Sequence, residues 1–168
     1  MTDLAETDAR PTVYVETSVI SYLAANPSGD LITRAHQEAT RRWWARGARW
    51  NLIVSSAVWI EAMKGDHATA LKRMGLLAAL PAVTADSRTR DLAAELLARG
   101  ALPQQARVDA DHVAIATVNA MDYLVTWNLK HIGNAVIRKR LEGICRSCGY
   151  EPPVICTPEA LLEAPNAQ

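Results

Sequence analysis

The sequence predicts an α/β fold, a three-layer sandwich with a mostly parallel central sheet. Two observations carry this prediction. Short apolar, β-rich runs alternate with amphipathic helical segments along the whole chain. The length of 168 residues suits one domain with one core, and no internal repeat or domain linker interrupts it. We therefore expect a flexible tail over residues 1–11 and a single domain over residues 12–164.

The expected strands are short apolar runs at residues 12–15, 51–54, 82–84, 123–126 and 153–156. The expected helices lie near residues 19–23, 30–46, 56–64, 66–80, 86–99, 108–120 and 134–147, and a last one begins at residue 158. Ser, Thr, Asp or Asn precedes most of them, Thr17 or Ser18 in the first case, and Gly or Pro follows several, Gly47 among them.

The composition is that of a globular protein, and its balanced charge does not indicate a binding partner. The chain is 49% hydrophobic and 21% charged, as globular proteins are, and its 18 basic residues equal its 18 acidic ones. Basic residues concentrate over residues 34–49 and 130–146, where they form either solvated helix faces or a surface for a phosphate backbone. We expect no membrane span and no signal peptide, and three cysteines that stay reduced in a cytoplasmic protein.

Four polar residues interrupt apolar segments where a parallel sheet would collect a ligand. Glu16 follows the first strand, Glu61 lies in the helix after the second, and Asp109 opens the helix before the strand that ends at Asn128. In such sheets ligands gather at the carboxyl ends of the strands, and crossover helices begin at that same edge. We therefore expect these four side chains to converge, although each alone could be an ordinary strand-end, helix or turn residue.

Three carboxylates at one place need a neutralising partner. At an effective dielectric constant of about 20, two unit charges 4 Å apart repel by roughly 4 kcal/mol. Oxygen ligands select Mg²⁺ or Mn²⁺, and such ions activate water and stabilise displacement at a phosphodiester. The pattern predicts metal-assisted phosphodiester hydrolysis.

These residues resemble the motifs of the PIN-domain family, and most closely the VapC-type toxin ribonucleases of type II toxin–antitoxin systems. The matching segments, in the family's order, are Tyr14-Val15-Glu16-Thr17-Ser18, Ser55-Ser56 with Glu61, Asp109-Ala110-Asp111-His112, and Asp122-Tyr123-Leu124-Val125-Thr126-Trp127-Asn128.

The resemblance implies a cytoplasmic endoribonuclease that uses Mg²⁺ or Mn²⁺, acts on RNA, binds a cognate antitoxin and forms a homodimer. It implies Glu16, Glu61 and Asp109 as metal ligands and Asn128 as the fourth catalytic position. Thr17, Ser18 and Thr126 would support them by hydrogen bonds, and Lys130 and His131 would contact the substrate phosphate. The antitoxin would bury an apolar groove to which Leu31, Ile32, Trp43 and Trp44 contribute, unless these pack in the core.

Two positions depart from the family pattern. The first-strand acid is usually Asp, and Glu16 is one methylene longer, which could turn a direct metal contact into a water-mediated one. Asn128 stands where Asp is usual, which lowers the charge of the site. Asp111 points away from Asp109 along the helix, and we expect His112 to be a buried, hydrogen-bonded helix residue rather than a ligand.

Two other classes of function compete with this reading. A non-catalytic module of the same fold could bind RNA or a protein, and Glu16 and Asn128 support that alternative. A phosphotransfer domain would need an Asp-x-Asp opening, or an acidic pair with a late Lys, and Glu16-Thr17-Ser18 supplies neither. The sequence also lacks the G-x-x-x-x-G-K-[ST] motif of phosphate-binding nucleotide folds.

Overall fold

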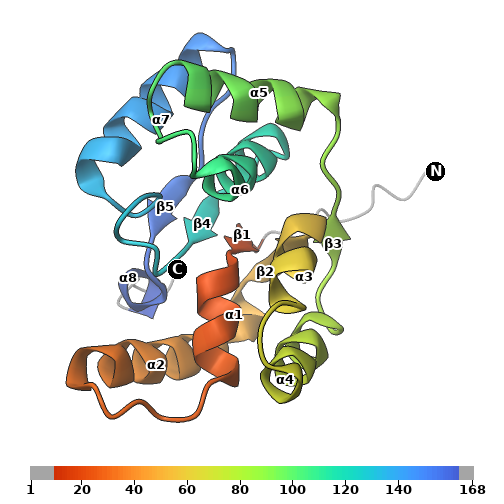
Figure 1. The fold of residues 1–168 in the computed structure, drawn as a ribbon, viewed down its shortest axis with the longest axis vertical. Helices are drawn as coiled ribbons and strands as arrows, with labels where there is room; N and C mark the ends of the chain where they lie inside the picture. The colour runs from red at the N-terminus through yellow and green to blue at the C-terminus, as the bar shows by residue number, and fades with distance from the viewer. Residues whose placement is uncertain (1–9, 163–168) are drawn as a thin grey trace, which may run out of the picture.

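The computed structural model describes residues 10–162, which form one parallel sheet with helices packed on it (Figure 1). The strands are β1 (Thr12–Val15), β2 (Asn51–Ser55), β3 (Ala82–Val83), β4 (Tyr123–Val125) and β5 (Val154–Cys156). Their order is β3-β2-β1-β4-β5, and every pair is parallel, as the sequence predicts. Residues 1–9 of the expected tail and residues 163 and 164 of the expected domain lie outside the described residues.

Helices connect all the strands, as parallel pairing requires. They are α1 (Thr17–Ala24), α2 (Leu31–Trp44), α3 (Ser56–Ala62), α4 (His67–Leu77), α5 (Ser87–Ala98), α6 (Arg107–Val118), α7 (Ala135–Ser147) and α8 (Pro158–Leu162). Helices α5, α6 and α7 lie together above the sheet in Figure 1, whereas α1, α2, α4 and α8 lie below it. This arrangement confirms the predicted three layers. Among the described helices, none is long and apolar enough to cross a membrane.

Short polar side chains fix the helix starts. Asp30, Asp66 and Asp86 each accept a hydrogen bond from the backbone N–H three residues on, at 2.8–2.9 Å, so one otherwise unpaired donor per helix is satisfied. One expectation was wrong, because Glu16, not Thr17 or Ser18, caps α1. Helix α2 ends at Trp44, close to the expected end near Arg46, and residues 47–49 form a separate 3-10 helix.

The central strand is buried on both faces. Val13, Tyr14 and Val15 are fully buried because β2 and β4 flank β1 and helices cover it above and below. Helix α6 is buried along most of its length, as its small apolar residues predict. A polar side chain on these buried segments must therefore find its hydrogen-bond partners inside the protein or at the edge of the sheet.

Candidate functional site

Glu16 lies at the carboxyl end of the central strand. Its backbone N–H donates to Val125 O at 3.1 Å, which continues the ladder between β1 and β4. Its carboxylate accepts hydrogen bonds from the backbone N–H and hydroxyl of Ser18, and from the hydroxyl of Thr126 at 2.8 Å. The residue is only 6% exposed, so these contacts hold a nearly buried carboxylate in one orientation.

Glu61 reaches the same place from α3. Helix α3 has only seven residues, and Glu61 lies in its second turn, near its end. Its Oε2 accepts a hydrogen bond from the hydroxyl of Thr17 at 2.6 Å and contacts His112 Nε2 at 2.7 Å. The Oε1 atom of Glu61 has no hydrogen-bond partner within residues 10–162.

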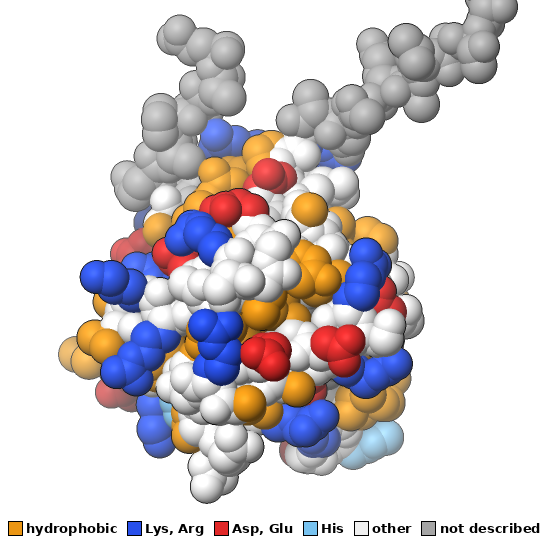
Figure 2. Space-filling model, turned by 90° about the horizontal axis from the view of Figure 1, so that it is seen from above, with side chains coloured by type: hydrophobic (Ala, Val, Ile, Leu, Met, Phe, Trp, Pro, Cys, Tyr) orange, Lys and Arg blue, Asp and Glu red, His pale blue; other side chains and the backbone are white. Residues whose placement is uncertain are grey.

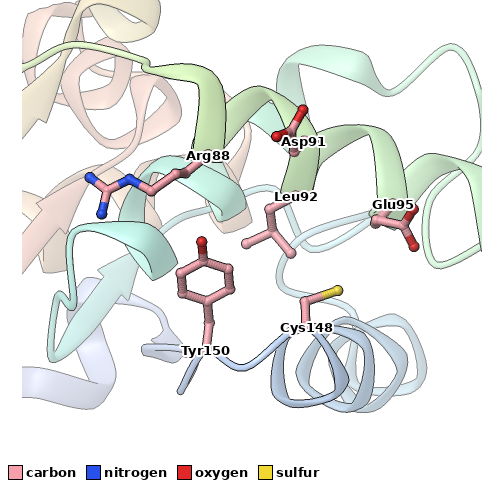
Figure 3. A pocket seen from close by; sticks show the side chains of 6 residues that line it. All are labelled: Arg88, Asp91, Leu92, Glu95, Cys148 and Tyr150. Carbon is pink, nitrogen blue, oxygen red and sulfur yellow. The ribbon is translucent and has the colours of Figure 1, made fainter.

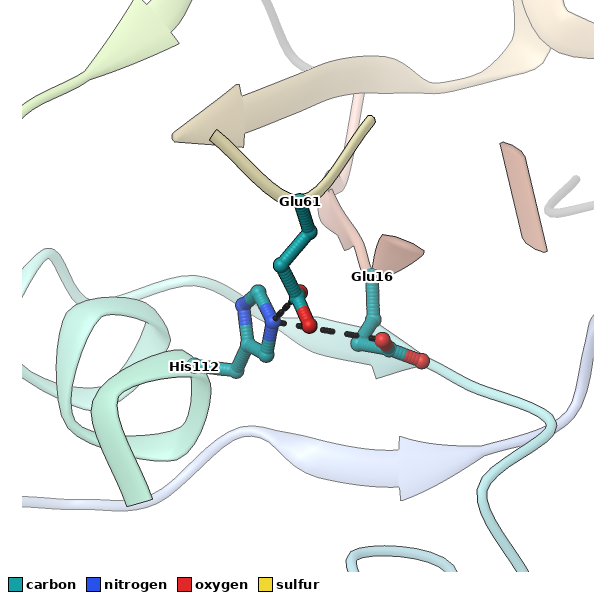
Figure 4. Close-up of side chains that lie close together, drawn as sticks. All are labelled: Glu16, Glu61 and His112. Carbon is teal, nitrogen blue, oxygen red and sulfur yellow. Dashed lines mark hydrogen bonds and ion pairs between the residues drawn. The ribbon is translucent and has the colours of Figure 1, made fainter. Parts of the chain in front are cut away.

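His112 completes a compact group with these two acids (Figure 4). One potential ligand atom from each of Glu16, Glu61 and His112 lies within 4.8 Å of the others, and no second group of this kind occurs among the described residues. His112 is 1% exposed, so the expectation of a buried, hydrogen-bonded histidine is confirmed. Its place beside the carboxylates was missed, although its position one turn after Asp109 puts it on the same helix face.

Asp109 belongs to an adjoining network rather than to the compact group. Its Oδ1 accepts from the Asn128 amide at 3.0 Å, and its Oδ2 contacts His131 Nδ1 at 2.7 Å. The backbone N–H of Asn128 donates to the Thr126 hydroxyl, which in turn donates to Glu16. The two networks therefore meet at Thr126.

The residues predicted for phosphate contact differ in their surroundings. His131 is held against Asp109, with 25% of its side chain exposed, and its backbone N–H donates to Asn128 Oδ1 at 3.1 Å. Lys130 is exposed, and within the described part of the chain it forms no hydrogen bond or ion pair. Of the nine predicted site residues, Lys130 alone lies outside the hydrogen-bonded networks.

In the described part of the chain, Glu61 and Asp109 contact histidines rather than lysine or arginine. Among the described residues, no lysine or arginine lies within ion-pair distance of Glu16, Glu61 or Asp109. Burial raises the pKa of Glu61, but hydrogen bonds from His112 and Thr17 outweigh this effect and bring it below its ordinary value. Burial lowers the pKa of His112, yet the contact with Glu61 and the charges of the nearby acids raise it overall.

These features fit a hydrated divalent cation of the Mg²⁺ or Mn²⁺ type. Glu16 is buried, Glu61 and Asp109 are partly buried, and within residues 10–162 the only basic side chains within ion-pair distance of these three acids are those of His112 and His131, so a cation would balance the remaining negative charge. The oxygen-rich donor set, with one imidazole beside it, suits such an ion better than a thiolate-binding metal. The three cysteines are free, and none belongs to a metal-binding group among the described residues. Burial also raises the pKa of the Cys156 thiol to about 11, which disfavours the thiolate that a metal would bind.

A pocket of about 220 Å³ opens elsewhere, between α5 and the end of α7 (Figure 3). Its lining is Arg88, Asp91, Leu92, Glu95, Cys148 and Tyr150. Arg88 is already paired with Asp86 at 2.8 Å, so the charges around the pocket are partly satisfied within the protein. None of the predicted site residues lines it.

Some of the basic residues expected to face a phosphate backbone are paired within the protein. On the face shown in Figure 2, Lys and Arg side chains alternate with Asp and Glu. Within the 130–146 group, Arg146 pairs with Glu142 and Glu151, and Arg138 donates to a backbone carbonyl of β5. Arg138 and Arg146 are therefore engaged within the protein, whereas Lys130 stays exposed.

No family model matches the sequence, and no curated protein matches it. Among solved structures, the crystal structure of Mycobacterium tuberculosis VapC20, described as a sarcin-ricin loop cleaving toxin, matches with a TM-score of 0.56. The match has 17% sequence identity and covers 74% of this chain and 95% of that chain. At this level of sequence identity, the structural match is evidence for a shared fold and for nothing more specific. The chain therefore shares the fold of VapC20, the PIN-like α/β fold that its sequence motifs predict.

Proposed function

We propose that the protein is a metal-dependent endoribonuclease of the PIN type, which hydrolyses phosphodiester bonds in RNA. One observation carries the proposal: the carboxylates of Glu16 and Glu61 lie together at the carboxyl edge of a parallel sheet, without a Lys or Arg partner among the described residues. The fold shared with a toxin that cleaves the sarcin-ricin loop adds support.

The chemistry divides between the cation and the chain. A bound Mg²⁺ or Mn²⁺ would polarise the scissile phosphate and lower the pKa of a water nucleophile. Glu16, Glu61 and Asp109 would hold the cation, directly or through water. Thr17, Ser18 and Thr126 orient the first two carboxylates, in the way that outer-shell hydrogen bonds fix metal ligands.

The adjoining network would serve the substrate side. Asn128 orients Asp109 through its amide, and His131 holds the other oxygen of that carboxylate. Lys130, exposed beside them, would attract the phosphate backbone without fixing its sequence. These roles predict loss of turnover when an acid is neutralised, and weaker, salt-sensitive RNA binding when Lys130 is removed.

The direct test is cleavage of a fluorescent single-stranded RNA with Mn²⁺ and with EDTA. We expect Asp109→Asn and Glu16→Gln each to lose at least about 100-fold in rate, the upper end of the effect found for residues that only support a metal ligand. Glu95→Gln, the same kind of change at an exposed position on α5, is the matched control and should retain the wild-type rate. Cleavage that survives EDTA, or that equals wild type in both acid variants, would refute the assignment.

A non-catalytic RNA-binding module is the second candidate. Two observations favour it: the Glu16 carboxylate already accepts hydrogen bonds from Ser18 and Thr126, and an amide occupies position 128. Such a module would bind the same RNA in an electrophoretic assay and leave it intact at saturating Mn²⁺.

The toxin role and its partners form a separate part of the proposal. Leu31 and Ile32, 82% and 68% exposed, leave apolar surface at the start of α2 for an antitoxin, whereas Trp43 is 1% exposed and packs in the core. We expect growth arrest on induction, relieved by Asp109→Ala or by co-expression of a cognate antitoxin.

Light scattering of the purified chain tests the expected homodimer. Growth that continues unchanged, with nuclease activity intact in vitro, would remove the toxin label alone.

A further inference from the structure

A buried chain of hydrogen bonds crosses the sheet to reach the acids. Ser55 Oγ lies 2.7 Å from the hydroxyl of Tyr14, and that hydroxyl lies 2.7 Å from His112 Nδ1. His112 Nε2 then lies 2.7 Å from Glu61 Oε2. Ser55 and Tyr14 are fully buried and His112 nearly so, and the chain joins β2, β1, α6 and α3.

The hydrogens of this chain can be assigned from its partners. Glu61 Oε2 accepts a hydrogen bond from the Thr17 hydroxyl. A carboxylate oxygen can only accept hydrogen bonds, so its 2.7 Å contact with His112 Nε2 places a proton on that nitrogen. The Tyr14 hydroxyl can donate to Nδ1 of a neutral ring or accept from a cationic one. The proton therefore stays on Nε2 in either charge state, because Nδ1 always has a matching partner.

This assignment conflicts with the simplest reading of the compact group, in which His112 is the third metal ligand. A metal bound at Nε2 would need the lone pair that the proton occupies. It would also remove one of the two hydrogen bonds that orient Glu61. His112 is 1% exposed and its Nδ1 already contacts the Tyr14 hydroxyl, so the ring has no second nitrogen to offer Glu61.

We propose that His112 is a positioning residue: its Nε2–H holds Glu61 Oε2 and leaves Glu61 Oε1 to the cation, and the buried Ser55–Tyr14 pair locks the ring in that orientation. The inference rests on the proposed metal-dependent function. It assigns a role to three polar residues that the sequence motifs leave in the core.

The test uses ¹⁵N-labelled wild-type protein and Mg²⁺, which is diamagnetic. In the metal-free protein we expect a slowly exchanging proton on His112 Nε2, assigned by its absence in His112→Gln. Saturating Mg²⁺ should shift the signals of Glu16 and Glu61 and leave that proton in place. An Nε2 that carries no proton in the metal-free protein, or that loses it on Mg²⁺ binding, overturns the inference while the nuclease proposal stands.

Calorimetric titration with Mn²⁺ gives a second, independent measurement. His112→Leu should weaken Mn²⁺ binding by roughly 10–100-fold, and His112→Gln, whose side-chain amide can still donate to Glu61, should lose less. His67→Gln, at an exposed position on α4, is the control. Equal losses in the Leu and Gln variants would favour a ligand role and contradict positioning. If wild type binds neither Mg²⁺ nor Mn²⁺, the proposed function fails and this inference fails with it.

Discussion

Asn128→Asp places a second carboxylate directly against Asp109 and tests whether the two face one cation. The amide nitrogen of Asn128 now donates to Asp109 Oδ1 at 3.0 Å. The substitution keeps the shape of the side chain, removes that donor and puts a negatively charged oxygen in its place. It also restores the acid that the resembled family usually carries at this position.

The expected size of the effect follows from that distance. At 3 Å and an effective dielectric constant of about 20, two like charges repel by roughly 5 kcal/mol. The variant can avoid part of this cost by keeping one carboxyl protonated, which at neutral pH costs about 4 kcal/mol for a shift of about three pKa units. Because 18% of the Asp109 side chain is exposed, solvent screening reduces the repulsion below the cost of protonation. We expect a loss of about 2–3 kcal/mol in the metal-free protein.

Thermal unfolding with and without Mn²⁺ measures both consequences. A loss of that size lowers the Tm by roughly 5–10 °C in a domain of this length. Saturating Mn²⁺ should recover most of it, so the Mn²⁺-induced rise in Tm should be larger in the variant than in wild type. Asn26→Asp, the same change in an exposed loop, should alter neither quantity. An Asn128→Asp protein with a wild-type Tm, or with no larger Mn²⁺ response, would show that Asp109 and position 128 do not share a cation.

Three further predictions follow from other parts of the structure. Ala120 follows α6 at φ 51°, in a left-handed conformation that suits Gly, so Ala120→Gly should stabilise the protein by about 1 kcal/mol in urea unfolding; a loss of stability would contradict this. A methyl group at Gly133 would lie 3.2 Å from Asn128 O, so Gly133→Ala should shift Asn128 and slow RNA cleavage while the Tm changes little. An unchanged cleavage rate would refute the close fit. The pKa of His112 is raised, so its contribution to the stability of the metal-free protein should be present below about pH 6.5 and decline as the pH rises through the folded-state pKa. The pKa of Glu61 is lowered, so its contribution to stability should be present above about pH 4.5 and be lost as the pH falls. Urea unfolding midpoints of wild type and His112→Gln, measured across pH, test both statements. A wild-type midpoint that does not decline at alkaline pH relative to that of His112→Gln would contradict the first.

Local patterns in the sequence were enough to predict the order of elements and the edge at which the site forms. Apolar runs, capping residues and Gly or Pro stops fix helix and strand positions to within a few residues, because these signals act over one or two turns. Alternation of strands and helices then requires parallel pairing, and parallel pairing places Glu16 and Thr126 at one edge. Capping was predicted less well, since Glu16 took the cap of α1 that Thr17 or Ser18 was expected to provide.

Tertiary structure alone decided which of these side chains touch. The sequence placed Glu16, Glu61 and Asp109 at one edge, but it could not show that His112 would stand beside the first two while Asp109 paired with Asn128 and His131. Those contacts depend on the strand order, with β1 between β2 and β4, and on the rotation of α6 over the sheet. Hydrophobic periodicity marks which helix face is buried, whereas the partners of these polar atoms are set by packing between segments roughly 20 to 110 positions apart in the chain.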